Sequence, residues 1–122
     1  MKLLLAGISG YGSYYMKLLT EYVDLEKNPL CGVVDPYPEK SPWLSWLKEH
    51  GVPVYPSLKA FYEKNTADLV FLATPIALHK PQILEAMEHG SHVLCEKPLT
   101  ARIQDALELK EARDHFGKML GV

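Results

Sequence analysis

The chain has 122 residues, of which 48% are hydrophobic and 23% are charged, and its formal net charge is −2. This length fits one domain with its own core, and the composition argues against disorder over the whole chain. The mild negative charge, without a long run of Lys or Arg, argues against nucleic acid or an anionic membrane as a partner.

Short apolar runs alternate with segments of helical spacing from the first residues onward. A continuous apolar run predicts a buried strand, whereas apolar residues three and four apart predict an amphipathic helix. Ser41 and Pro42 predict a helix start, because a hydroxyl cap precedes a proline. The elements predicted in the first half are a strand at Leu3–Ile8, a helix at Tyr11–Val23, a strand at Leu30–Val34, a helix at Trp43–Glu49, a strand at Val52–Tyr55 and a helix that Ser57 caps and that runs to about Lys64.

The same alternation continues in the second half, with glycine after two of the predicted helices. The elements predicted there are a strand at Asp68–Ala73, a helix at Pro81–His89 that stops at Gly90, a strand at His92–Cys95, a helix from Thr100 or Ala101 to Phe116 that stops at Gly117, and a strand at Lys118–Val122. This order predicts an α/β fold with a doubly wound parallel sheet, the Rossmann fold, as a single domain over residues 1–122. The chain is too short for a complete eight-fold α/β barrel.

The cysteines and the apolar runs indicate a cytoplasmic protein. Cys31 and Cys95 lie in strand-like stretches, which is typical of buried reduced thiols and not of a disulfide framework. The apolar start breaks at Gly7, too early for a signal peptide, and no run approaches the roughly 20 residues of a membrane span.

A glycine-rich turn, Gly7-Ile8-Ser9-Gly10-Tyr11-Gly12, joins the first predicted strand to the first predicted helix. Glycines let the backbone turn tightly and approach a diphosphate, and the free amides at the helix start favour an anion there. A plain strand-to-helix turn is the alternative. Asp35 and Pro36 end the second strand at the distance where a carboxylate binds the ribose hydroxyls of a dinucleotide. An anion at Asp35 would repel a 2′-phosphate, so NAD is favoured over NADP.

The glycine pattern has one misfit. Counted from Gly10, the Gly-x-Gly-x-x-Gly pattern would place a third glycine at position 15, where the chain has Tyr15. That glycine normally permits close packing of helix and strand, so a tyrosine is expected to push the helix outward and loosen the cofactor site.

Two further groups of polar residues follow later strands, where a doubly wound sheet binds its ligands. Thr74 and Pro75, with His79 shortly after, follow one strand, and Glu96-Lys97-Pro98 follows the next. Lys97 beside a nicotinamide ring could polarise a substrate hydroxyl or carbonyl. A surface ion pair is the alternative for Glu96 and Lys97. A helix-start or packing role is the alternative for His79, which has no metal-ligand partner at a useful spacing.

The segments Ala73–His79 and Ala86–Thr100, with the Glu-Lys-Pro motif, resemble the Gfo/Idh/MocA family of glucose–fructose oxidoreductase and inositol dehydrogenase relatives. The resemblance covers essentially the whole chain and implies an NAD(P)-binding domain of an oxidoreductase of sugars, inositols or related polyols. It implies that Lys97 is the catalytic-site lysine and that the cofactor is bound by Gly7, Ser9, Gly10, Tyr11, Gly12, Asp35, Pro36, Thr74, Pro75, His79, Glu96 and Lys97. The family often has Asn after Thr-Pro, where this chain has Ile76.

The resemblance also implies a C-terminal domain for substrate and oligomer contacts that is absent from this chain. We expect a fragment of a longer protein, which would be a homo-oligomer, or else a naturally short chain. This part alone should give little or no turnover. Two alternatives stay open: a non-catalytic dinucleotide sensor, and a degenerate member in which Tyr15 and Ile76 mark a lost cofactor site. The sequence does not specify the substrate or the direction of the reaction.

Overall fold

The sheet at the centre of the molecule has six strands, all parallel, in the order β3-β2-β1-β4-β5-β6. We describe it from a computed structural model that covers residues 1–122. The strands are β1 (Leu3–Ala6), β2 (Leu30–Val34), β3 (Val54–Tyr55), β4 (Leu69–Leu72), β5 (His92–Cys95) and β6 (Leu120–Gly121). The predicted doubly wound parallel sheet is therefore confirmed, and all six predicted strands form.

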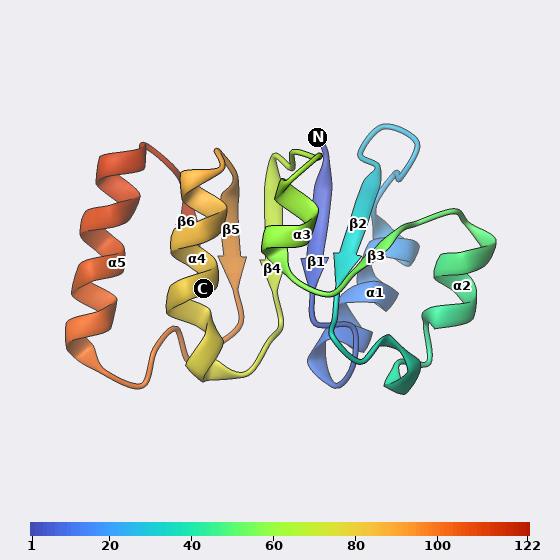
Figure 1. Ribbon diagram of the computed structural model, residues 1–122, viewed down its shortest axis with the longest axis horizontal. Helices are drawn as coiled ribbons and strands as arrows, with labels where there is room; N and C mark the ends of the chain where they lie inside the picture. The colour runs from blue at the N-terminus through green and yellow to red at the C-terminus, as the bar shows by residue number, and fades with distance from the viewer.

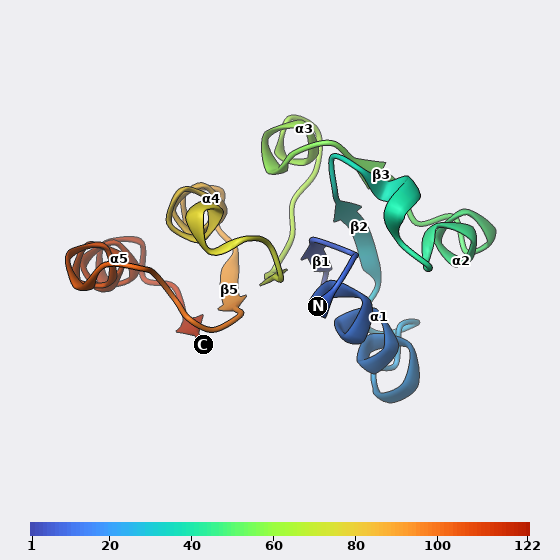
Figure 2. The same ribbon diagram turned by 90° about the horizontal axis from the view of Figure 1, so that it is seen from below.

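Helices cover both faces of this sheet (Figures 1 and 2). They are α1 (Tyr11–Tyr22), the 3₁₀ turn η1 (Pro38–Lys40), α2 (Leu44–Glu49), α3 (Leu58–Tyr62), α4 (Ile76–Glu88) and α5 (Ile103–Phe116). Figure 2 shows α1 on one side of the sheet and α3 and α4 on the other, with α5 beside α4. None of these helices is both long and apolar enough to span a membrane.

The sheet separates two apolar cores, because alternate residues of each strand point to opposite faces. Within β1, Leu4 belongs to the core under α3, α4 and α5, whereas Leu3 and Leu5 belong to the core under α1 and α2. All three side chains are buried. Because all the strands are parallel, the loops that follow β1, β2, β4 and β5 lie at the same edge of the sheet, the lower edge in Figure 1.

Helix α4 begins five residues earlier than predicted, at Ile76 and not at Pro81. Proline is common at the first helical position, since it lacks the amide that an interior position donates. Here Pro81 lies inside the helix, which keeps a buried face that includes His79, Ile83 and Met87. Burial of that face outweighs the single hydrogen bond that the proline cannot make.

The predicted cap at Ser41 is also wrong, because α2 begins only at Leu44 and its N-cap residue is Trp43. Ser41 is buried, and its hydroxyl donates to the carbonyl oxygen of Ile8 at 2.7 Å while accepting from the amide of Trp43. Its hydroxyl therefore ties the loop after β2 to the loop after β1. Helix α5 likewise starts at Ile103, two or three residues later than predicted.

Candidate cofactor site

The glycine turn brings the start of α1 against the ends of β1 and β4. Gly7 has φ +84°, and a Cβ atom there would lie 2.6 Å from the carbonyl oxygen of Ala73. A Cβ atom on Gly12 would lie 1.9 Å from the carbonyl oxygen of Gly7. Both contacts are with backbone, so only glycine fits at these two positions. The first turn of α1 is thus packed closely on the sheet, and Tyr15 does not push it outward.

The N-terminal end of α1 presents amides that no protein group satisfies. Its N-cap residue, Gly10, provides no side-chain cap, and the first turn carries no acidic residue. The backbone N–H groups of Ser9, Gly10 and Tyr11 donate to no acceptor within the chain. Free amides and the positive end of a helix dipole favour a bound anion.

Asp35 follows β2 and faces the same turn. Its Oδ2 accepts from the amide of Ile8 at 3.1 Å, and its Oδ1 accepts from the amide of Tyr37 at 2.8 Å. The carboxylate is thereby fixed in place by two backbone donors. Each of its oxygens can still accept a further hydrogen bond from a ligand hydroxyl.

A cleft of about 750 Å³ lies above these groups, a size in the usual range for small-molecule sites. Eight of the predicted site residues line it: Gly7, Ser9, Gly10, Tyr11, Asp35, Pro36, Thr74 and Pro75. The other predicted residues, Gly12, His79, Glu96 and Lys97, lie outside its lining. The structure therefore brings together the loops after β1, β2 and β4, and places the Glu-Lys-Pro motif beside the cleft.

The rest of the lining was not predicted from the sequence. It comes from the loop after β2, the start of α3 and one face of α4, and includes Tyr37, Lys40, Ser57, Leu78, Gln82 and Glu85. The spacing of Leu78, Gln82 and Glu85 is the signal that could have revealed the α4 wall, because residues four and three apart share one helix face. Thr74 donates its hydroxyl to Oε1 of Gln82 at 2.5 Å, which links this wall to the loop after β4.

His79 is buried, with 1% of its surface exposed, and joins two loops. Its Nε2 lies 2.8 Å from the carbonyl oxygen of Thr74, and its Nδ1 lies 3.1 Å from the carbonyl oxygens of Pro98 and Leu99. This position favours the packing role over a direct contact with the cofactor. No cluster of three or more His, Cys, Asp or Glu residues suited to a metal ion is present.

The Glu-Lys-Pro motif lies beside α1 and contacts two of its tyrosines. The hydroxyl of Tyr15 donates to Oε1 of Glu96 at 2.9 Å, and Nζ of Lys97 lies 5.5 Å from the ring centroid of Tyr11. Burial, followed by the hydrogen bond to Glu96, raises the pKa of Tyr15 to about 12. Because Tyr11 lines the cleft, Lys97 stands at its margin.

Both cysteines are free thiols, as the sequence predicted, although only Cys95 is fully buried. Burial, with a smaller effect of the neighbouring Glu96, raises the pKa of Cys95 to about 12. A thiol with such a pKa is unreactive at neutral pH, so Cys95 serves packing behind the motif.

Comparisons with known proteins agree with this arrangement. The chain is 30% identical over 104 residues to a scyllo-inositol 2-dehydrogenase (NADP(+)), IolU, of Bacillus subtilis (strain 168). The matched segment covers 85% of this chain and 31% of that protein. It is 45% identical over 53 residues, or 43% of this chain and 14% of the relative, to an inositol 2-dehydrogenase of Rhodococcus jostii (strain RHA1). The chain therefore spans about a third or less of the length of these relatives.

The fold is shared with solved structures over nearly the whole chain. The WlbA dehydrogenase from Bordetella pertussis, solved in complex with NADH and UDP-GlcNAcA, matches 98% of this chain and 35% of its own, with a TM-score of 0.84 and 26% identity. The GFO_IDH_MocA family model, described as an oxidoreductase family with an NAD-binding Rossmann fold, matches residues 1–122. The chain therefore belongs to the Gfo/Idh/MocA oxidoreductase family, of which it is the NAD-binding Rossmann domain.

Proposed function

We propose that this domain serves a dehydrogenase or reductase that transfers a hydride between NAD(H) and a sugar, an inositol or a related polyol. One observation carries the cofactor assignment: the unsatisfied amides of Ser9, Gly10 and Tyr11 line the same cleft as the Asp35 carboxylate. The amides suit a diphosphate and the carboxylate suits ribose hydroxyls. The substrate class follows from the names of the inositol and sugar-nucleotide relatives.

The residues around the cleft would have distinct roles in binding and hydride transfer. Gly7 and Gly12 bring α1 close to the sheet, so that its first amides can bind the diphosphate. Thr74 and Pro75 would border the cofactor on the β4 side. The nicotinamide ring, when bound, supplies or accepts the hydride. Lys97 at the cleft margin would hold the substrate oxygen by a hydrogen bond and stabilise charge that develops on it.

We assign NAD(H) in preference to NADP(H) because of Asp35. Its carboxylate is held toward the cleft by the amides of Ile8 and Tyr37, so it cannot turn away from a 2′-phosphate without losing both bonds. Lys40 is a cation in the same cleft, with Nζ 4.7 Å from the ring centroid of Tyr37. Binding of a 2′-phosphate therefore depends on the balance between Asp35 and Lys40.

The test is a titration of NADH and NADPH into this chain, followed by nicotinamide fluorescence. We expect NADH to bind more tightly, and Asp35→Asn to weaken NADH by roughly tenfold, because hydrogen bonds to a charged group contribute about 1.5–3 kcal/mol. Asp114→Asn is the control, since Asp114 is exposed on α5 and pairs with its neighbour Arg113. Binding of neither nucleotide at millimolar concentration would contradict the assignment.

A non-catalytic dinucleotide sensor would use the same cleft without needing Lys97. The two functions separate in a full-length protein that contains this domain. Lys97→Ala should remove most turnover there and leave NADH binding nearly unchanged, whereas unchanged turnover would favour the sensor.

We also propose that a second domain completes the substrate pocket and the oligomer interface, and that the protein acts in the cytoplasm.

A further inference from the structure

We propose that Tyr15 is a positioning residue that fixes Glu96, and through it the Lys97 turn, at the nicotinamide end of the cleft. This inference rests on the proposed function. Tyr15 stands where the glycine pattern, counted from Gly10, would have its third glycine. There the tyrosine would act as part of the site and not as a defect in it.

Two tyrosines of α1 contact the Glu-Lys-Pro motif. Tyr11 and Tyr15 are one helical turn apart and so lie on the same side of α1. They meet two consecutive residues of the motif, Lys97 and Glu96 respectively. Glu96 is otherwise held through its backbone: its amide donates to the carbonyl oxygen of Leu72 at 2.8 Å, and its carbonyl oxygen accepts from Sγ of Cys95 at 3.4 Å. The hydroxyl of Tyr15 is thus the one protein group that holds the Glu96 carboxylate.

The Tyr15 ring is fixed by packing against the sheet. Its centroid lies 5.9 Å from that of Phe71 in β4, so the ring packs on the sheet and the hydroxyl reaches toward β5. The half-buried hydroxyl keeps its proton under all ordinary conditions, since burial and Glu96 raise the pKa of Tyr15 to about 12. Tyr15 therefore remains a donor to Glu96 at any pH at which the enzyme would work.

Gly12, and not position 15, makes the close approach at the start of α1. A third glycine usually gives a helix room to approach its strand. In this chain Gly12 already makes the backbone contact with Gly7, and the buried face of α1 is completed by Met16 and Leu19. Position 15 is therefore free to carry a side chain that reaches across to the Glu-Lys-Pro motif.

The experiment compares NADH with ADP-ribose, which lacks only the nicotinamide ring. Tyr15→Phe removes the hydroxyl and keeps the ring on Phe71. We expect it to weaken NADH by roughly fivefold and to leave ADP-ribose binding unchanged, as the loss of one hydrogen bond would. Tyr14→Phe is the matched control, because Tyr14 is 57% exposed on the same helix and its hydroxyl has no partner. A merely structural role would weaken both ligands equally, and that result, or no change in either, overturns the proposal.

A double-mutant cycle with Glu96→Ala provides the second measurement. Once Glu96 is gone, Tyr15→Phe should have no further effect on NADH binding, whereas an undiminished effect would contradict the positioning role. Titration of Glu96→Ala followed by NMR of the assigned Tyr15 ring gives a readout that needs no Tyr15 variant: the Tyr15 phenol should ionise at a lower pH than in the wild type, because the hydrogen bond to Glu96 is lost. If the wild type binds neither NADH nor ADP-ribose, the proposed function itself fails; if it binds both equally, only the positioning role fails.

Discussion

Nε2 of His79 lies 2.8 Å from the carbonyl oxygen of Thr74, and this contact anchors one side of a bridge between the loops after β4 and β5. The other side is formed by Nδ1, which faces the carbonyl oxygens of Pro98 and Leu99. The two loops that border the expected nicotinamide end are therefore held by one buried side chain of α4. The residue matters for the site although it does not line the cleft.

We predict that His79→Ala lowers the free energy of unfolding by about 2–4 kcal/mol, because it leaves a cavity and removes the hydrogen bonding between the buried imidazole and the backbone carbonyl groups of the two loops. Urea denaturation monitored by circular dichroism measures the change. His115→Ala is the control, since His115 is exposed on α5 and makes no hydrogen bond. Equal stability of the two variants would show that the bridge contributes nothing to stability.

The sequence predicted the parts of the site that lie in consecutive residues. The glycine turn and Asp35 are local signals, because the turn geometry and the strand end dictate the residue types. The α4 wall of Leu78, Gln82 and Glu85 was not predicted, since the expected helix start at Pro81 left Leu78 outside the helix and concealed the face that it shares with the other two. The Tyr15–Glu96 bond was also missed, because it joins residues 81 apart whose approach is set by the packing of α1 on the sheet.

Gly12 offers a direct test of the close approach between α1 and β1. A Cβ atom there would meet backbone atoms of Gly7, so Gly12→Ala must displace the helix or the turn. We expect a loss of more than about 2 kcal/mol of stability, as for other overpacked sites, together with loss of NADH binding. Gly117→Ala is the control for backbone conformation: it has φ +62° but open space around it, and should cost only about 1 kcal/mol. Thermal unfolding and NADH titration separate the two effects.

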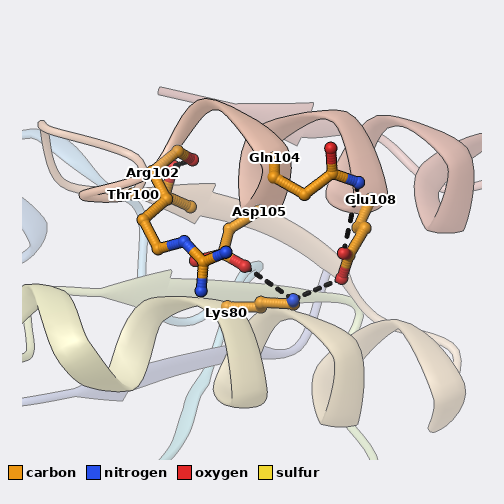
Figure 3. A network of polar contacts seen from close by, with 6 residues as sticks. All are labelled: Lys80, Thr100, Arg102, Gln104, Asp105 and Glu108. Atoms are coloured by element: carbon orange, nitrogen blue, oxygen red, sulfur yellow. Dashed lines mark hydrogen bonds and ion pairs between the residues drawn. The ribbon is translucent and has the colours of Figure 1, made fainter.

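Lys80 joins α4 to α5 through Asp105 and Glu108 (Figure 3). Its Nζ is 2.8 Å from Oδ1 of Asp105, and the side chains of this pair are 30% and 22% exposed. The hydrogen bonds from Lys80 hold the pKa values of both carboxyl groups below their ordinary range. A lowered carboxyl pKa gives stability that is present above the ordinary value and is lost as the pH falls through the folded-state value.

We therefore predict that Lys80→Met lowers the melting temperature at neutral pH, and that the difference from the wild type shrinks below about pH 4. High salt should shrink it as well, because the pair is only partly buried. Lys17→Met is the control, since Lys17 and Glu21 are 3.9 Å apart and largely exposed. A difference that is constant with pH would mean that Lys80 acts through the packing of its aliphatic chain.

The choice between NADH and NADPH depends on Lys40 as well as on Asp35. In the wild type, Asp35 opposes a 2′-phosphate and Lys40, in the same cleft, would attract it. Asp35→Asn removes the opposing charge, so we expect NADPH affinity to rise by roughly tenfold, and to fall steeply with added salt as Lys40 becomes the main determinant. Adding Lys40→Ala to that variant should cancel the gain for NADPH and leave NADH binding unchanged. Lys59→Ala is the control, because Lys59 lies on α3 and does not line the cleft. If the double variant keeps its NADPH affinity, the 2′-phosphate is bound by backbone amides, and Lys40 serves only the cation–π contact with Tyr37.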